Sequence, residues 1–281
     1  MAWHEWPLIV FTVLAQTSVG AFLVLATLLL TKQLSSDAED RLHKAMFGLW
    51  AIMGLGFLAS VMHLGSPFRA MNALNMLGSS WLSNEIASGS GFFALGGLFW
   101  LLSVLNKGNQ ALRKGLLIGA MIIGVGFMYS MIMVYMIDTV PTWYTSLTPA
   151  AFILTMVVSG FALAHTLLAL SNNNKACTDK TLSVMGLISL FAVVITIMLL
   201  SVHLGEVQTS ATSALAVVPE YASIQTTRLV LLSLGLLLWI APVIRNKAIT
   251  AGPMSIAFVL ILLSELMGRG VFYGMHMTAG V

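Results

Sequence analysis

The sequence predicts an all-α membrane protein with eight transmembrane helices. Only 8% of its 281 residues are charged, 58% are hydrophobic, and the mean hydropathy is +0.95. Soluble domains carry about 25% charged residues, so this composition is typical of a polytopic membrane protein. A helix needs about 20 apolar residues to cross the hydrocarbon core of a bilayer. Eight runs reach that length: 7–30, 45–63, 86–105, 115–137, 149–170, 181–203, 226–244 and 253–275.

The basic residues predict the orientation of these helices, because cytoplasmic connections carry an excess of Lys and Arg. Ten of them lie in four alternate connections, 31–44, 106–114, 171–180 and 245–252. On the opposite side only Arg69 lies in a connection. We therefore expect the four basic connections to face the cytoplasm. Both the N- and C-termini are then outside, in the periplasm of a Gram-negative cell.

No polar segment is long enough to form a soluble domain, so we expect a single integral membrane anchor domain over residues 1–281. The second predicted helix ends in His63-Leu64-Gly65, and the sixth ends in His203-Leu204-Gly205 on the same side of the membrane. This repeat predicts two four-helix bundles in the same orientation, formed by halves 1–137 and 149–281.

The connection between the second and third predicted helices gathers three ionisable side chains. His63 ends one helix, Arg69 lies in the connection, and Glu85 opens the next helix. His63 and Glu85 each have a simple structural explanation: helix C-termini favour cations, and first turns behind an N-cap such as Ser83 or Asn84 favour anions. However, an ionisable residue at the centre of a bilayer costs roughly 2.5–3.5 kcal/mol, so a group of them predicts a functional site.

A quinol dissolved in the membrane fits this group of side chains. Its two hydroxyls need hydrogen-bond acceptors and a route for two protons. The neutral imidazole of His63 and the carboxylate of Glu85 can serve as those acceptors. Segment 68–77 spaces its apolar residues at helical intervals, so we expect a lid or a docking surface there, with Arg69 on its polar side.

Two other classes of membrane protein compete with a quinol-oxidising subunit. A haem-bearing anchor would need two histidines at one mid-membrane depth, whereas His63, His203 and His276 all lie outward. A secondary transporter would place its polar groups near the midplane on interrupted helices, whereas these lie near one face. The single cysteine, Cys177, excludes cysteine-ligated clusters within the sequence. The spacing therefore disfavours haem without excluding it, and the sequence has no evident redox metal site of its own, so electrons taken here must pass to another subunit.

Other ionisable residues have mainly structural explanations. Glu265 and Arg269 are spaced i, i+4 on the eighth predicted helix, which favours an internal ion pair, with a proton relay as the alternative. We expect His165, near the inner end of the fifth predicted helix, to satisfy a hydrogen bond. Glu206 and Glu220 lie in a connection and should be solvated.

Six segments spread along the sequence resemble the membrane-anchor subunit of bacterial dimethyl-sulfoxide reductase, the DmsC family. They are His4-Glu5-Trp6-Pro7, Met46-Phe47-Gly48-Leu49-Trp50, His63-Leu64-Gly65-Ser66-Pro67, Ser83-Asn84-Glu85-Ile86-Ala87-Ser88-Gly89-Ser90, Asp138-Thr139-Val140-Pro141-Thr142-Trp143-Tyr144 and Gly268-Arg269-Gly270-Val271-Phe272-Tyr273-Gly274. The resemblance implies an eight-helix anchor of the bacterial inner (cytoplasmic) membrane that binds menaquinol and lacks haem. It also implies two partners: an iron–sulfur subunit with four clusters and a catalytic subunit carrying a molybdopterin cofactor.

The same resemblance assigns the quinol site. His63 and Glu85 look like the residues that take part in menaquinol oxidation, with Leu64, Gly65 and Arg69 beside them. The protein would then be a non-catalytic subunit in the sense that terminal reduction occurs on a partner. The anchor of a related S- or N-oxide reductase or of a selenate reductase would look the same. Segments 171–182 and 206–218 match poorly, and no site is expected there.

Overall fold

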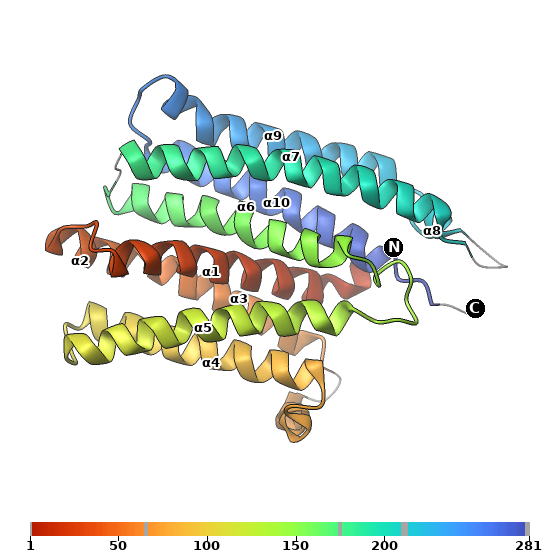
Figure 1. Cartoon of the computed structure of the whole chain (residues 1–281), viewed down its shortest axis with the longest axis horizontal. Helices are drawn as coiled ribbons and strands as arrows, with labels where there is room; N and C mark the ends of the chain where they lie inside the picture. Colours follow the sequence, from red (N-terminus) through yellow and green to blue (C-terminus); the bar gives the residue numbers. More distant parts are fainter. Residues whose placement is uncertain (1, 65–66, 174–175, 209–212, 279–281) are drawn as a thin grey trace.

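Long apolar helices run side by side along one axis (Figure 1). The computed structural model describes residues 2–64, 67–173, 176–208 and 213–278, and within these ranges it contains helices and no strand. Eight helical spans are long and apolar enough to cross a membrane, which confirms the predicted fold class. The long helices are α1 (Trp6–Leu30), α3 (Phe47–Met62), α4 (Trp81–Val104), α5 (Gln110–Tyr135), α6 (Leu147–Leu170), α7 (Ala176–Glu206), α9 (Tyr221–Ile244) and α10 (Ala251–Gly274).

Short helices occupy several connections. They are η1 (Ala2–Glu5), α2 (Ser36–Ala45), η2 (Pro67–Met76) and α8 (Ala214–Val217). Helix α2 forms where the sequence predicts only a connection. This helix buries Ala38 and Leu42, and its acidic first turn and basic last turn complement the helix dipole. The Arg41 Nε–H donates to the carbonyl of Ser171 at 2.9 Å, which ties α2 to the end of α6.

Four helices end in the same way at one end of the bundle. The residue after each helix cap has a positive φ of 50–53°, a left-handed conformation that Asn tolerates better than most residues. Backbone hydrogen bonds typical of a Schellman motif accompany each one. The residues are Lys32, Asn106, Asn172 and Asn246, which follow α1, α4, α6 and α9. Figure 1 shows these four helix ends at the same end of the bundle, as the alternation of the basic connections predicts.

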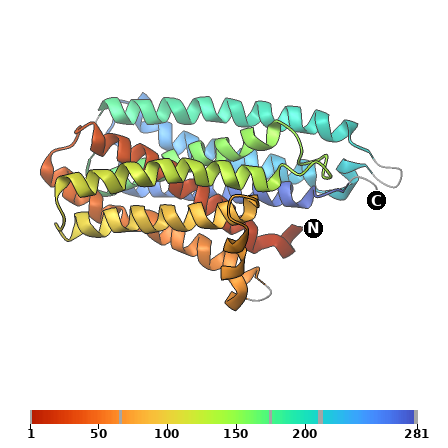
Figure 2. The same ribbon diagram turned by 60° about the horizontal axis from the view of Figure 1, so that its bottom comes forward.

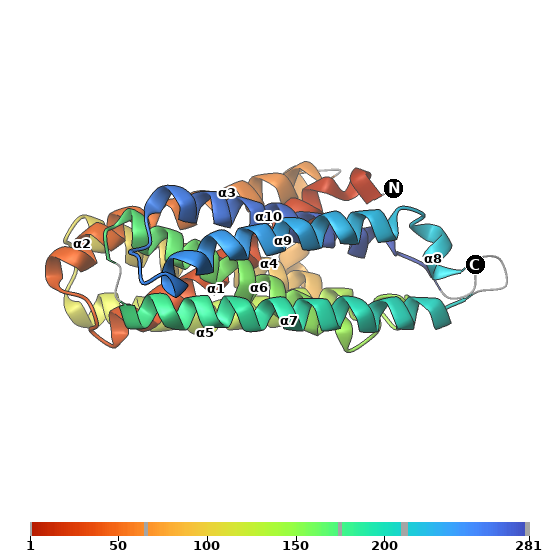
Figure 3. The same cartoon turned by 90° about the horizontal axis from the view of Figure 1, so that it is seen from above.

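Both termini lie at the opposite end, which we call the termini end (Figures 1 and 3). The connection from α3 to α4 belongs to this end, and so does the connection from α5 to α6. His63, at the start of this connection, therefore lies at the same end of the bundle as the N-terminal segment.

Helices α1 and α6 form the centre of the bundle, where their backbones meet. A Cβ on Gly160 would lie 2.7 Å from the Cα of Gly20 and 2.9 Å from the backbone nitrogen of Ala21. A Cβ on Gly20 would collide with the carbonyl of Met156. Small residues permit such close approach between membrane helices, and the resulting packing holds the helices together.

We expect Gly160→Ala to destabilise the folded protein by about 3 kcal/mol, because overpacking a tight contact forces the two backbones apart. Thermal unfolding in detergent measures the effect. Gly97→Ala is the matched control, since nothing lies within 4 Å of a Cβ at that helical glycine. Equal stability of the two variants would contradict the close α1–α6 contact.

The packing of the first four spans resembles that of the last four. Helix α1 packs on α3 and α5, and α6 packs on α7 and α10 in the same order along the sequence. Likewise α4 packs mainly on α5, and α9 packs mainly on α10. Helices α1 and α6 then join the two groups through their glycine contact.

Candidate functional site

Glu85 lies inside the bundle, and the expectation that it lies in the first turn of its helix is wrong. Helix α4 begins at Trp81 behind Ser80 as N-cap, so Glu85 falls in the second turn. Asn84 does not cap the helix either, because its Oδ1 accepts a hydrogen bond from the Gly78 N–H at 2.7 Å. Only 4% of Glu85 is exposed, and its Oε1 has no hydrogen-bond partner among the described residues. Burial of a polar atom without a partner is costly, so this oxygen is a candidate binding atom.

His63 lies at the termini end of the neighbouring helix. It is the C-cap residue of α3, and 43% of its side chain is exposed. Its Nδ1 lies 3.5 Å from Oε2 of Glu5, a carboxylate whose side chain is also 42% exposed. The sequence predicts His63 and Glu85 together in one group, whereas the carboxylate that His63 contacts is Glu5. A sequence signal could have identified Glu5: the segment His4-Glu5-Trp6-Pro7 is predicted on the same side of the membrane as His63.

The connection between these two residues is not a tight turn. Residues Pro67–Met76 form η2, a ten-residue 3₁₀ helix that runs across the bundle axis beside α4 (Figure 2). The spacing of apolar residues in segment 68–77 predicts a helix, and the structure has a 3₁₀ helix there. Leu64 is 39% exposed, Gly65 lies outside the described residues, and Arg69 is placed in η2 by its backbone alone.

An open groove of about 540 Å³ begins one helical turn from Glu85. It is formed by the start of α4 and the end of α5, with Trp81, Leu82, Met133 and Ile137 among the lining residues. Positions i and i+4 share a helix face, so Trp81 and Glu85 lie on the same side of α4. The volume falls within the range of about 300–1,000 Å³ typical of small-molecule sites.

A second set of buried polar groups lies inside the bundle, and sequence reasoning missed three of them: Gln16, Tyr135 and Tyr273. The hydroxyls of Tyr135 (α5) and Tyr273 (α10) share a hydrogen bond, and both residues are buried. Arg269 donates from Nη2 to Oε1 of Gln16 at 2.8 Å. A buried Gln or Tyr in an apolar helix has no local sequence signature, because its partner comes from another helix.

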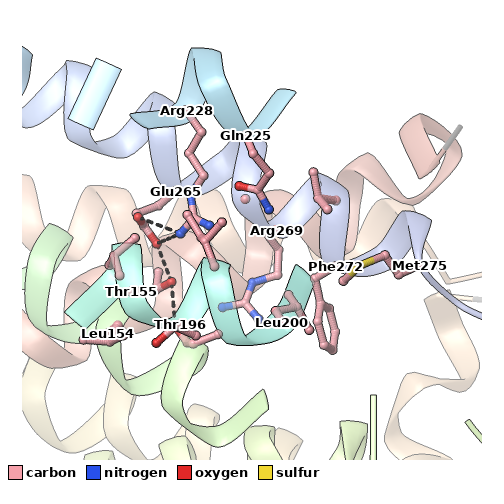
Figure 4. A pocket seen from close by; sticks show the side chains of 15 residues that line it. Leu154, Thr155, Thr196, Leu200, Gln225, Arg228, Glu265, Arg269, Phe272 and Met275 are labelled. Atoms are coloured by element: carbon pink, nitrogen blue, oxygen red, sulfur yellow. Dashed lines mark hydrogen bonds and ion pairs between the residues drawn. The ribbon is translucent and has the colours of Figure 1, made fainter. Parts of the chain in front are cut away.

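Glu265 and Arg269 do not form the ion pair that their i, i+4 spacing favours. Glu265 instead lies 3.2 Å from Nη2 of Arg228 on α9, and the hydroxyl of Thr155 donates to its Oε2 at 2.6 Å (Figure 4). The guanidinium of Arg269 stacks over the ring of Phe152, with its central carbon 3.5 Å from the ring centroid. Packing of α9 against α10 thus supplies a partner that local spacing could not reveal.

His165 and His203 have structural partners. His165 is fully buried, accepts a hydrogen bond from the Trp239 indole at 2.7 Å, and lies 3.0 Å from Oδ1 of Asp179, as its predicted structural role requires. His203 donates to the carbonyl of Pro141 at 3.1 Å. Across the described residues, no group of three or more His, Cys, Asp or Glu side chains could hold a metal ion. Glu206 and Glu220 are exposed, as predicted.

Comparison with known proteins assigns the family. The family described as "DMSO reductase anchor subunit (DmsC)" matches residues 1–275. Two relatives from Escherichia coli (strain K12), the C subunit of anaerobic dimethyl sulfoxide reductase and the anaerobic dimethyl sulfoxide reductase subunit YnfH, are each 46% identical over 99% of this sequence and 97% of their own length. The C subunit of the Haemophilus influenzae reductase is 40% identical over the same shares. The protein therefore belongs to the DmsC family of dimethyl-sulfoxide reductase anchor subunits.

Proposed function

We propose that this protein oxidises menaquinol and passes the electrons to an iron–sulfur subunit of an anaerobic dimethyl-sulfoxide reductase-type complex in the bacterial inner membrane. The observation that carries the proposal is Glu85. Its buried, unpartnered carboxyl oxygen lies one helical turn from the open groove at Trp81. A quinol hydroxyl is a donor of the kind that this acceptor lacks. The apolar side chains of the groove, such as Leu82, Met133 and Ile137, suit a ring that bears an isoprenoid tail, and Ser80, Asp138 and Tyr144 supply polar groups.

The chemistry requires two proton acceptors and one electron route. One quinol O–H donates to Oε1 of Glu85, which takes that proton as the ring is oxidised. The second proton goes to the imidazole of His63. The two electrons leave one at a time to a cluster held by the partner subunit, and quinone remains. Arg69, with Leu64 and Gly65 beside His63, steadies the singly deprotonated quinol or the docking loop.

His63 and Glu5 provide the way out for protons. Both side chains are nearly half exposed and lie 3.5 Å apart, so a proton on the imidazole can pass to the carboxylate and then to water. Because both residues lie at the termini end, the protons are released on the side of the membrane where the termini lie.

We expect His63→Ala to lower menaquinol-dependent turnover by about 10²-fold, the lower limit for loss of a general base. The steady-state rate with a menaquinol analogue measures the effect in the assembled complex. His4→Ala is the matched control, since His4 is an exposed histidine beside Glu5. A variant at His63 with the turnover of the control would remove this residue from the site.

The partners follow from the family. The relatives are named as subunits of a reductase, and we propose the corresponding assembly here: a four-cluster iron–sulfur subunit docked at the termini end and a molybdopterin catalytic subunit beyond it. The terminal acceptor is a property of the catalytic subunit, so a related S- or N-oxide or selenate reductase remains the alternative. The described spans are continuous helices rather than interrupted ones, which favours an anchor over a secondary transporter.

Purification tests the assembly. We expect this protein to co-purify with two partners that contain iron–sulfur clusters and a molybdopterin cofactor, and the visible spectrum to lack a Soret band. A Soret band assigned to this subunit would overturn the haem-free proposal. Uptake of a substrate by liposomes that contain this subunit alone would support the transporter instead.

We also propose that halves 1–137 and 149–281 are parallel repeats within the single domain 1–281, each forming a four-helix bundle. The matched packing order of the two sets of helices supports this, and so do the similar left-handed caps of α1 and α6 and of α4 and α9. His63 is the C-cap residue of α3 and His203 lies in the last turn of α7, so each histidine lies near the end of its helix.

A further inference from the structure

The second half of the sequence forms a small, partly enclosed chamber of its own (Figure 4). It lies between α6, α7, α9 and α10, with Leu154, Val193 and Leu200 among its apolar walls. Six polar side chains also line it: Thr155, Thr196, Gln225, Arg228, Glu265 and Arg269. Its cavity volume is about 40 Å³. One water needs roughly 10–15 Å³ on this measure, so the chamber has room for a group the size of a phosphate rather than for a quinone ring.

The charges in this chamber do not balance. Glu265 is 1% exposed and pairs with Arg228. Arg269 is 3% exposed and, among the described residues, contacts the neutral Gln16 amide and the ring of Phe152 rather than a carboxylate. These neutral partners lower the cost of burying the guanidinium but supply no countercharge. One positive charge is therefore left over in a setting where buried charges are normally paired.

Hydrogen-bonding capacity is left over as well. The Nε–H of Arg228 and the Oε1 of Gln225 are buried without a partner among the described residues, and both side chains line the chamber. Rotating the side-chain amide of Gln225 by half a turn exchanges the positions of its oxygen and nitrogen. Gln225 can therefore direct its NH₂ group, a donor, into the chamber. Two guanidinium groups and one amide can then donate to a single anionic ligand.

The repeat shows how this chamber differs from the site at Glu85. Gln225 is the fifth residue of α9, as Glu85 is the fifth residue of α4. The two helices begin Tyr221-Ala222-Ser223-Ile224-Gln225 and Trp81-Leu82-Ser83-Asn84-Glu85, and both fifth residues carry an unpartnered oxygen among the described residues. An amide accepts no proton at neutral pH. The equivalent position in the second half therefore suits binding rather than proton transfer.

We propose that this chamber binds the phosphate headgroup of an acidic phospholipid, held by the Arg228 Nε–H, the Arg269 guanidinium and the Gln225 amide. Arg228 lies seven residues after the start of α9, about 10 Å from that helix end at 1.5 Å per residue. A phosphate can therefore reach it from the headgroup region at the termini end. Exposed apolar side chains of α7, such as Ile195 and Met198, can hold the acyl chains.

Retention of lipid by the purified complex tests the proposal. After detergent washing, native mass spectrometry should show one phosphatidylglycerol or cardiolipin bound to the wild-type complex. Arg228→Lys keeps the positive charge next to Glu265 but removes the free Nε–H, and Gln225→Leu removes the amide. Each should weaken retention about 10-fold. Arg245→Gln, at the other end of α9, is the matched control and should retain the lipid.

Two further measurements decide the source of the phosphate and separate this proposal from the quinol site. Phosphatidylglycerol added to lipid-depleted wild type should raise the melting temperature, because a ligand of the native state stabilises it. Equal stabilisation by millimolar inorganic phosphate, or equal retention by all variants, would overturn the lipid assignment. Menaquinol turnover at saturating lipid should be unchanged in Arg228→Lys and Gln225→Leu, so failure here leaves the Glu85 site untouched.

Discussion

Glu85→Gln is expected to lower menaquinol-dependent turnover by about 10²–10⁴-fold, the contribution typical of a positioned general base. The substitution keeps the size of the side chain and its burial inside the bundle, but an amide cannot take the hydroxyl proton. The complex should therefore assemble normally. Turnover with a menaquinol analogue measures the loss, and a dye that reduces the partner subunits directly shows that they remain active.

The matched control is Glu206→Gln, the same change at an exposed glutamate at the termini end. It should turn over menaquinol like the wild type. The same loss in both variants would mean that the measurement reports a general change of surface charge. Full turnover in Glu85→Gln would exclude the carboxylate as a proton acceptor.

Glu265→Leu is expected to destabilise the fold by about 3–5 kcal/mol, because removing one partner of a buried ion pair leaves an uncompensated charge. Here the effect falls on two guanidinium groups, since Arg228 loses its carboxylate and Arg269 already lacks one among the described residues. Thermal or denaturant unfolding in a fixed detergent measures the change. The hydroxyl of Thr155 also loses its acceptor, which adds to the cost.

A double variant separates the ion pair from the packing around it. Replacing both Glu265 and Arg228 by Met removes the two charges together and should restore much of the stability, as for other buried pairs replaced by apolar residues. Additive losses in the double variant would show that Glu265 and Arg228 do not interact. That result would contradict the contact of 3.2 Å between them.

The number of spans and their alternation can be predicted from the sequence because both depend on composition. Apolar runs and clustered Lys and Arg residues lie along the sequence itself, with no need of tertiary contacts. The boundaries are less accurate. Helix α4 begins five residues before the predicted start at residue 86, because Trp81 and Leu82 extend the helix behind Ser80. Helix α2 escapes prediction because its charged residues interrupt the apolar run.

The site is predictable only in part, for a different physical reason. Glu85 stands out in the sequence because a carboxylate beside an apolar run is costly, and its side chain is buried inside the bundle. The partners of the charged residues are not predictable, because they come from distant helices. Glu5 lies beside His63. Glu265 pairs with Arg228, whereas its i, i+4 spacing favours a pair with Arg269. Contacts of this kind depend on helix packing, which the periodicity of a sequence does not contain.

The most direct test measures electron transfer from menaquinol to the partner subunit. Menaquinol is mixed rapidly with the oxidised complex, and electron paramagnetic resonance measures reduction of the iron–sulfur clusters of the partner. We predict fast cluster reduction in the wild type and in Glu206→Gln, and reduction slowed by about 100-fold or more in Glu85→Gln. Cluster reduction at the wild-type rate in Glu85→Gln would contradict the proposal that quinol is oxidised at this carboxylate.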